Sequence, residues 1–316
     1  RGKSPREWTA ESYPTPEGMG PRHYPATMTS DVVPARPAAT ILVLRDGPSG
    51  PEVLMVRRST SASFMGGIWV FPGGGVDQGD AAPEMLARIK GRDDAQASAE
   101  LGLEDGGLAL FVAALREVFE ESGILLAVDA EGRHLGAEAA ERLAEHRRAL
   151  NAREVSFLEV LEAEDLHLDC SVLEHHAHWI TPTAEVKRFD TYFFAALAPE
   201  GQEAAHDEAE TIASIWVTPA EAFERHRQSE IHMVMPTLRN LAFVAPHGTA
   251  AEVLAASKAE TDIPTILPKM VEDDVDVILL VPGDEGYEAA EGLTNDPKGF
   301  VRAARRRAVK ENPPRD

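Results

Sequence analysis

The fold of this chain is decided by residues 116–124, which read Arg116-Glu117-Val118-Phe119-Glu120-Glu121-Ser122-Gly123-Ile124. They belong to an apolar block, residues 110–126, that predicts the strongest helix of the chain. Its three glutamates are spaced i, i+3 and i+4, so their carboxylates share one helix face. The opposite face carries Leu115, Val118, Phe119 and Ser122. The sequence therefore predicts a helix that packs on one side and is acidic on the other.

The acidic face requires a counter-charge. Three like charges repel one another, and the macrodipole disfavours anions in the last turns of a helix. Mg²⁺ or Mn²⁺ is the expected counter-ion, because hard divalent ions prefer carboxylate oxygens, and Arg116 can orient one of the glutamates. An acidic face exposed to solvent is the alternative for this helix taken alone.

A glycine-rich loop precedes the helix in the sequence. Residues 71–80 read Phe71-Pro72-Gly73-Gly74-Gly75-Val76-Asp77-Gln78-Gly79-Asp80 and follow a β-rich run at 68–71. Glycines allow backbone groups to approach a ligand or a metal ion closely. A glycine triplet alone is more often a turn than a phosphate site, so the argument depends on the loop and the acidic helix together.

The loop and the helix, in this order, resemble the box of the Nudix hydrolases. The family pattern is Gly, five residues, Glu, seven residues, then Arg-Glu-apolar-x-Glu-Glu-x-Gly-apolar. Residues 116–124 match the second half in full. In the first half, Gly74 and five residues lead to Asp80 instead of Glu, and 35 residues instead of seven separate Asp80 from Arg116. An insertion of 28 residues can loop outward, but whether Asp80 takes the family position stays open.

The upstream segment is similar to Nudix members that hydrolyse coenzyme A and acyl-coenzyme A. Arg58-Ser59 and Gly67 match their signature, whereas Ser63 stands where that signature has an arginine. The insertion after the glycine loop and residues 179–182 and 187–194 resemble the acyl-coenzyme A diphosphatase branch (nucleoside diphosphate-linked moiety X motif 19-like). The resemblance spans about residues 38–230.

This resemblance implies a metal-dependent diphosphatase. Water would attack phosphorus in the diphosphate of coenzyme A or acyl-coenzyme A, giving 3′,5′-ADP and (acyl-)4′-phosphopantetheine. A diphosphatase for ADP-ribose, NADH or another nucleoside diphosphate derivative is the alternative within the class. A Nudix-fold module that binds a nucleotide without cleaving it is the alternative from another class, but such a module needs no cluster of metal ligands.

The resemblance also implies roles for individual residues. The expected catalytic residues are Arg116, Glu117, Glu120 and Glu121, with Glu117 or Glu121 as the base. The expected ligands of Mg²⁺ or Mn²⁺ are Glu117, Glu120, Glu121 and the carbonyl of Gly74. The expected substrate-binding residues are Arg57, Arg58, Gly74, Gly75, Lys187 and Arg188. A distal acid is expected among Asp207, Glu208 and Glu210, which the sequence does not rank.

The composition of the chain limits the classes of partner that we expect it to bind. The formal net charge of −22 disfavours a sequence-independent nucleic-acid binder, because phosphate backbones require a cationic surface. No run approaches the roughly 18 apolar residues of a membrane span. The single cysteine, Cys170, excludes an intrachain disulfide and fits a reducing compartment. We expect a cytoplasmic protein with a small nucleotide substrate and neither a membrane nor a nucleic-acid partner.

The expected fold is α/β of the Nudix type, a mixed β-sheet sandwiched between α-helices. Residues 1–36 read as a Pro-rich extended or disordered segment, and residues 37–235 as the Nudix domain with helical insertions at about 81–110 and 129–178. Residues 236–316 are expected to form a C-terminal helical extension packed on that domain, with helices near 236–245, 249–259 and 299–310. A homodimer through this region is compatible with every functional alternative. The cluster His175, His176 and His178 matches no zinc spacing and predicts a polar loop.

Overall fold

The computed structural model of the protein describes residues 32–59, 67–205, 211–272, 277–290 and 292–293. The chain divides into two compact units. The larger unit comprises Pro37–Ala177 and Thr191–Ile263, and the smaller one includes His178–Asp190 and the chain from Pro264 onward. The expected distal acids Asp207, Glu208 and Glu210 and the expected helix at 299–310 lie outside the described residues.

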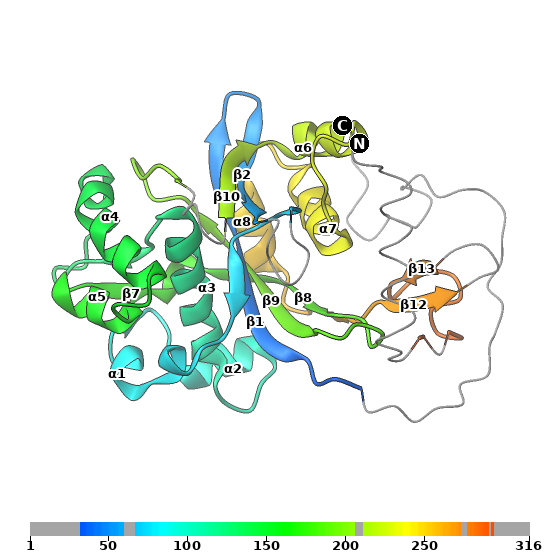
Figure 1. The fold of residues 1–316 in the computed structure, drawn as a ribbon, viewed down its shortest axis with the longest axis horizontal. Coiled ribbons are helices and arrows are strands. Elements are labelled where there is room, and N and C mark those ends of the chain that lie inside the picture. The colour runs from blue at the N-terminus through cyan, green and yellow to red at the C-terminus, as the bar shows by residue number, and fades with distance from the viewer. Residues whose placement is uncertain (1–31, 60–66, 206–210, 273–276, 291, 294–316) are drawn as a thin grey trace. The chain divides into compact units, whose positions relative to one another are not determined.

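The larger unit is built on a sheet whose strands follow the order β10-β2-β1-β9-β8 (Figure 1). Strand β1 (Arg36–Gly47) and β2 (Gly50–Arg58) form an antiparallel hairpin, and β10 (Thr211–Val217) pairs antiparallel with β2. Strand β8 (Glu174–Ile180) and β9 (Phe189–Leu197) complete the order. Two short strands join it, β3 (Trp69–Val70) on β2 and β4 (Gly73–Gly75) on β1. The predicted α/β class with a mixed sheet is confirmed.

Helix α3 (Gly107–Ser122) is the predicted helix of the acidic block. It begins three residues earlier than predicted and ends before Gly123, because that glycine adopts a left-handed φ of 76° that breaks the helical path. Its apolar residues pack into the core, where the ring of Phe111 contacts that of Phe194 of β9 at an interplanar angle of 47°, with ring centroids 4.5 Å apart. The helix that carries the glutamates is therefore fixed on the sheet by its buried face.

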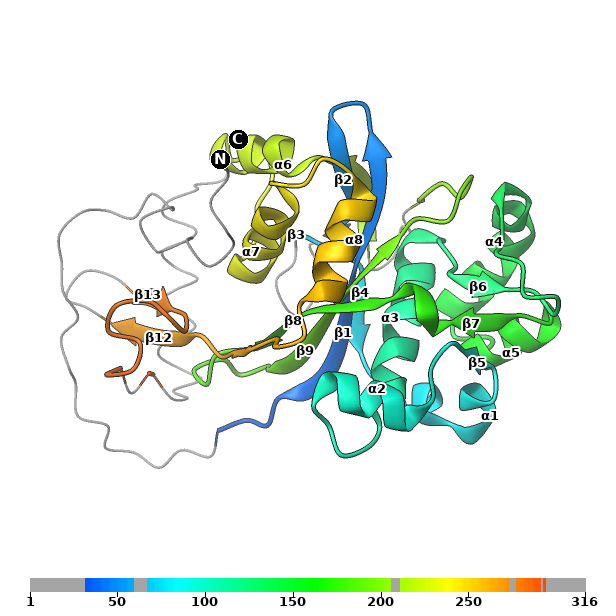
Figure 2. The same ribbon diagram turned by 180° about the vertical axis from the view of Figure 1, so that it is seen from behind.

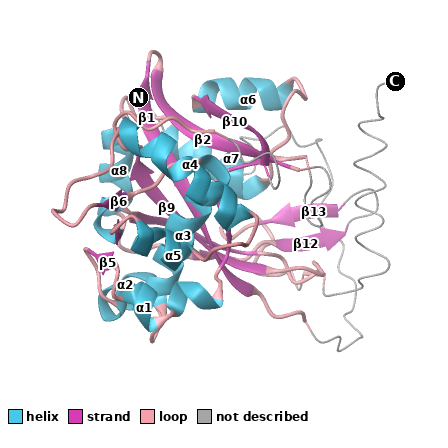
Figure 3. Cartoon of the chain, turned by 60° about the vertical axis from the view of Figure 1, so that its left-hand side comes forward, coloured by secondary structure: helices cyan, strands magenta, loops and turns pink. Residues whose placement is uncertain are grey.

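The two predicted insertions surround α3. The first holds the 3-10 helix η3 (Gln78–Ala81), α1 (Pro83–Leu86), β5 (Ile89–Lys90) and α2 (Asp94–Leu101). The second holds β6 (Ala127–Val128), α4 (Ala137–Asn151), α5 (Phe157–Ala163), β7 (His167–Asp169) and the 3-10 helix η4 (Cys170–Val172). Strands from both insertions form one small sheet of order β5-β7-β6. Helices α1 and α2 lie at the same end of α3 (Figure 3), and α4 lies beside its other end (Figures 1 and 2).

The other face of the main sheet is covered by helices of the C-terminal half (Figure 2). They are α6 (Pro219–Arg227), α7 (Met235–Val244) and α8 (Ala250–Ala259), and they confirm the helices predicted there. Thr218 is the N-cap of α6, since its Oγ1 accepts a hydrogen bond from the backbone N–H of Glu221 at 3.3 Å.

Two local predictions were wrong. His175, His176 and His178 do not form a polar loop but lie buried on strand β8. Side chains along a strand alternate between the two faces of the sheet, and both faces of this sheet are covered. Gly73–Gly75 is not a loop throughout but pairs as strand β4 with Ala38–Thr40 of β1. Glycines can take part in a ladder where a side chain would meet the neighbouring element.

The smaller unit contains strands as well as chain without regular structure. Strand β11 (Thr265–Ile266) runs parallel to β8 at His178 and Trp179, and β12 (Lys269–Glu272) forms an antiparallel pair with β13 (Val277–Leu280). His178 joins the strands through Asp190 Oδ1 at 2.5 Å and Thr265 Oγ1 at 2.9 Å. None of the helices in the described part of the chain is long and apolar enough to cross a membrane.

Candidate active site

The glutamates of α3 face the glycine strand β4. The backbone N–H of Gly73 donates a hydrogen bond to Glu121 Oε2 at 3.0 Å. A β-carbon at Gly74 would overlap the carboxylate of Glu117, so the absence of a side chain there is what lets this carboxylate lie against the strand. The helix and the glycines that the sequence placed in order are thus in direct contact, as a site between them requires.

Arg116 connects these groups into one network. Its guanidinium binds both carboxylate oxygens of Asp80, at 2.8 and 2.9 Å, and Glu117 Oε1 at 2.9 Å. It also donates to both oxygens of Glu120 at 3.3 Å and to the carbonyl oxygen of Gly75 at 2.9 Å. Burial by itself would lower the pKa of Arg116, but the hydrogen bond to Asp80 and the surrounding carboxylates raise it above its ordinary value. The guanidinium therefore stays charged and fixes the acidic groups around it.

The position of Asp80, which the sequence left open, is clear in the structure. Asp80 is buried, and its carboxylate also accepts a hydrogen bond from the backbone N–H of Asp77 at 2.8 Å. This turn, helix η3, holds Asp80 directly after the glycine strand and against α3. The insertion that separates Asp80 from Arg116 in sequence leaves the pair intact, because η3 holds Asp80 against α3 before the inserted helices α1 and α2 begin.

The charges of the network do not balance. Asp80, Glu117 and Glu120 contact one guanidinium, and Glu121 lies on the same helix against Gly73, so the four carboxylates and Arg116 carry an excess of three negative charges when all five groups are ionised. Asp80, Glu117 and Glu121 are buried, whereas the side chain of Glu120 is 26% exposed and gives the cluster its access to solvent. Carboxylate and carbonyl oxygens of this kind suit a hard divalent cation.

The donor set fits a divalent ion in its chemistry. Within the described ranges, no group of three or more His, Cys, Asp and Glu side chains is already arranged so that it could hold a metal ion. The carboxylates are engaged instead with Arg116 and with the glycine strand. Rotation about the side-chain bonds of Glu117 and Glu120 changes their partners without moving the helix that carries them.

The predicted substrate-binding arginines on β2 point to opposite sides of the sheet, as neighbours on a strand do. Arg58 lies opposite Thr211, whose hydroxyl donates to the carbonyl oxygen of Glu121 at 3.2 Å, so Arg58 lies near the glutamate end of α3. Its Nε atom is buried and has no hydrogen-bond partner within the described part of the chain. Arg57 is exposed and its Nε donates to the carbonyl oxygen of Gly67 at 3.3 Å.

The other two predicted cations belong to the smaller unit. Arg188 is buried, and its guanidinium donates to the backbone carbonyls of Thr181 at 3.0 Å and Val33 at 2.7 Å. The ammonium of Lys187 lies 5.4 Å from the ring centre of Phe189. The structure therefore brings together Gly74, Gly75, Arg116 and the three glutamates in the larger unit, with Arg58 nearby.

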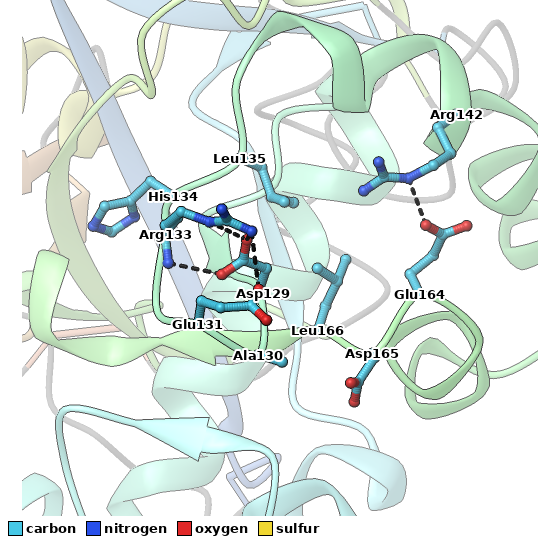
Figure 4. A pocket seen from close by; sticks show the side chains of 10 residues that line it. All are labelled: Asp129, Ala130, Glu131, Arg133, His134, Leu135, Arg142, Glu164, Asp165 and Leu166. Carbon is cyan, nitrogen blue, oxygen red and sulfur yellow. Dashed lines mark hydrogen bonds and ion pairs between the residues drawn. The ribbon is translucent and has the colours of Figure 1, made fainter.

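A pocket of about 620 Å³ opens on the second insertion (Figure 4). Its charged side chains are paired with one another: Arg133 with Asp129 at 2.7 Å and Glu131 at 2.9 Å, and Arg142 with Glu164 at 2.5 Å. None of the predicted site residues lines it. Because its arginines already have carboxylate partners, this pocket does not offer the cationic surface that a diphosphate needs.

Two side chains that the sequence analysis did not single out contact the glutamate helix. Arg147 and Asn151 of α4 both donate to the carbonyl oxygen of Glu120, at 2.9 and 3.0 Å. Their i, i+4 spacing on an amphipathic helix was visible in the sequence, but nothing in it indicated which helix end they would meet.

Comparison with known proteins agrees with this geometry. Residues 91–244 match the profile of the NUDT19 Nudix domain. The chain is 28% identical over 290 residues to the acyl-coenzyme A diphosphatase NUDT19 of Gallus gallus, covering 80% of this chain and 77% of that protein. It is 26% identical over 293 residues to the Homo sapiens protein of the same name, with the same shares of 80% and 77%.

A solved structure is also similar to this chain. The crystal structure of a NUDIX hydrolase from Alicyclobacillus acidocaldarius is 30% identical and superposes with a TM-score of 0.55. The match covers 71% of this chain and 97% of that one.

Proposed function

Because the chain belongs to the Nudix hydrolase family, in which it is related to the acyl-coenzyme A diphosphatases, we propose that it hydrolyses coenzyme A or acyl-coenzyme A. Cleavage of the diphosphate linkage would give 3′,5′-ADP and (acyl-)4′-phosphopantetheine. The observation that carries the proposal is the packing of the Glu117 and Glu121 carboxylates against the glycine strand, with Arg116 joining them to Asp80. A module that only binds a nucleotide has no need of this buried acidic network.

Nudix hydrolases generally use divalent metal ions, and we propose that Glu117, Glu120, Glu121 and the carbonyl oxygen of Gly74 hold Mg²⁺ or Mn²⁺. When bound, such ions offset the negative charge of a diphosphate, polarise phosphorus and acidify the attacking water. The excess negative charge of the network supports the proposal, because without a cation it would repel an anionic substrate.

The chain's own residues then have separate tasks. Glu117 or Glu121 accepts the proton of the attacking water, while the water oxygen bonds to phosphorus and the anhydride P–O bond breaks. Arg116 holds the carboxylates in place and cannot itself give up a proton. Arg58, with its buried Nε near the glutamate end of α3, is proposed to bind a phosphate group. Phosphate contacts of Arg57, Lys187 and Arg188 stay predictions.

The proposal is tested by product chromatography with Mg²⁺ or Mn²⁺ on coenzyme A, a medium-chain acyl-coenzyme A, ADP-ribose, NADH and a nucleoside triphosphate. We expect 3′,5′-ADP from the coenzyme A compounds. Glu120→Gln should lower the rate by more than the roughly 10–100-fold typical of an outer-shell change, because it removes a ligand charge. The control is Glu145→Gln on α4, where an exposed glutamate pairs with Arg148 at 3.6 Å.

The outcomes separate the alternatives. Turnover of ADP-ribose or NADH alone would keep the acidic site and discard the coenzyme A substrate. Absence of turnover across the panel in the presence of metal would support the nucleotide-binding module. Size-exclusion chromatography with light scattering tests the expected homodimer, and fractionation of cells tests the expected cytoplasmic location.

A further inference from the structure

The C-terminal end of α3 is held by groups from outside the helix. The last four carbonyl oxygens of any α-helix lack partners within it. In α3, Glu120 O accepts from Arg147 and Asn151, Glu121 O from the hydroxyl of Thr211 at 3.2 Å, and Ser122 O from the backbone N–H of Ala205 at 2.8 Å. The turn that carries two of the three glutamates is thus capped by donors from distant parts of the chain.

Arg147 and Asn151 differ from the other donors because both act on the carbonyl of Glu120. They lie one turn apart on α4, so their side chains share the face that meets α3. Gly123 makes room for Arg147, since a β-carbon there would lie 3.1 Å from its Nη1 atom. A cation at this end of the helix also opposes the partial negative charge of the macrodipole.

Glu120 depends on this support more than its neighbours do. Glu117 is buried against Gly74, and Glu121 accepts from Gly73. The carboxylate of Glu120 is partly exposed, and its contact with Arg116 is long, at 3.3 Å to each oxygen. The two 2.9–3.0 Å bonds to its backbone are the shorter ones, and they hold a helix end that would otherwise fray.

The N-terminal end of α3 offers the matching contrast. There the first insertion supplies acceptors, with Asp94 of α2 bound to the N–H groups of Gly106 and Leu108 at 3.0 Å, and Ser98 Oγ to that of Gly107 at 2.9 Å. These contacts stabilise the same helix but lie several turns from the glutamates.

We propose that Arg147 and Asn151 are positioning residues for the active site, through which the second insertion fixes the backbone of Glu120 and the last turn of α3 in the place from which the Glu120 carboxylate reaches a divalent ion. This inference rests on the proposed function, because it concerns the same glutamates. It assigns to helix α4 a task that its charged, amphipathic sequence does not suggest.

The test measures Mn²⁺ binding by electron paramagnetic resonance, together with thermal unfolding and kcat. The variants are Asn151→Leu, which keeps the number of side-chain heavy atoms and the branch at Cγ, and Arg147→Met, which keeps the stem against Gly123, with Arg147→Lys as the conservative rescue. Asp94→Ala is the control, since it removes a cap from the other end of α3. We expect Mn²⁺ affinity and kcat to fall about 10-fold in Asn151→Leu and Arg147→Met, and to recover partly in Arg147→Lys. In Asp94→Ala, both should change less than about twofold at a similar loss of melting temperature.

Two outcomes would contradict the inference. If the Arg147 and Asn151 variants bind Mn²⁺ as tightly as Asp94→Ala does at the same loss of melting temperature, Arg147 and Asn151 are structural caps only. That result would overturn the inference and leave the proposed function intact. A wild-type protein that binds no Mn²⁺ and hydrolyses no substrate would overturn the proposed function and this inference together, which separates the two failures.

Discussion

The two faces of the main sheet bury ionisable groups in opposite ways. On the α3 face, Arg116 keeps its charge inside a ring of carboxylates, and its pKa is raised. On the other face, His176 is held neutral between α7 and α8, where its Nδ1 lies 3.1 Å from Ser257 Oγ and its ring lies edge-on to Phe243. Burial, together with the charge of His175, lowers the pKa of His176 to about 4.

The difference shows two solutions to one physical problem. Removing a charge from water is costly unless an opposite charge and hydrogen bonds replace the solvent, or unless the group gives up its charge. The α3 face uses the first solution and keeps its groups ionised in one hydrogen-bonded network. The α7–α8 face uses the second and keeps its histidine neutral.

The largest expected effect is on the charged face. Arg116→Met should lower the free energy of unfolding by about 3–5 kcal/mol, because it leaves Asp80 and Glu117 buried without a counter-charge. Urea unfolding measures the loss. Adding Asp80→Asn should restore part of it, because one stranded charge is then removed, and strictly additive losses would contradict the buried network.

An exposed arginine provides the matched control for this change. Arg133 also bridges two carboxylates, Asp129 and Glu131, but its side chain is 73% exposed. Arg133→Met should therefore lower the free energy of unfolding far less than Arg116→Met does, because solvent screens the pair and replaces its interactions. Equal losses at Arg116 and Arg133 would remove the distinction between the two settings.

The neutral face should respond to pH. His176 has a lower pKa in the folded chain, about 4, than the ordinary 6.5 of an unfolded histidine. Its contribution to stability is complete above pH 6.5 and is lost as the pH falls toward 4, because protons then bind the unfolded state preferentially. The loss is at most about 3 kcal/mol, at roughly 1.4 kcal/mol per pKa unit.

The measurement is urea unfolding of wild type and His176→Gln between pH 7.5 and about 4. Because only the wild type loses this contribution, the stability difference between the two proteins should shrink as the pH falls. A difference that stays constant over this range would show that the histidine is not kept neutral by its surroundings.

The smallest effect on stability, with a clear effect on activity, is expected for Gly74→Ala. Its new β-carbon would displace the Glu117 carboxylate, which is the far end of a flexible side chain, so the backbone keeps its path while the contact of Glu117 with Arg116 is disturbed. We expect kcat/KM to fall about 10–100-fold with less than about 1 kcal/mol of lost stability. Gly79→Ala, in the same segment but with open space around it, should retain activity, and similar losses in both variants would break the argument.

Residues 116–124 by themselves predicted a helix with Glu117, Glu120 and Glu121 on one face, because helical spacing fixes that face whatever surrounds it, and the glycines at 73–75 were needed to predict a site there. Local patterns also predicted the helical insertions and the helices α7 and α8. These features depend on contacts between residues near in sequence, and such contacts leave a periodic or compositional signal.

Only the tertiary structure decided which distant groups meet. The pairing of Asp80 with Arg116 spans 36 residues, and the bonds of Arg147 and Asn151 to Glu120 span 27 and 31. Likewise, His175 and His176 are adjacent histidines that the sequence does not distinguish. In the structure, His175 contacts Phe194 on the α3 face of the sheet, and His176 contacts Phe243 on the other face. The physical reason is that a charge or a hydrogen-bond donor specifies the kind of partner it needs, whereas the packing of helices on the sheet determines which partner comes within reach.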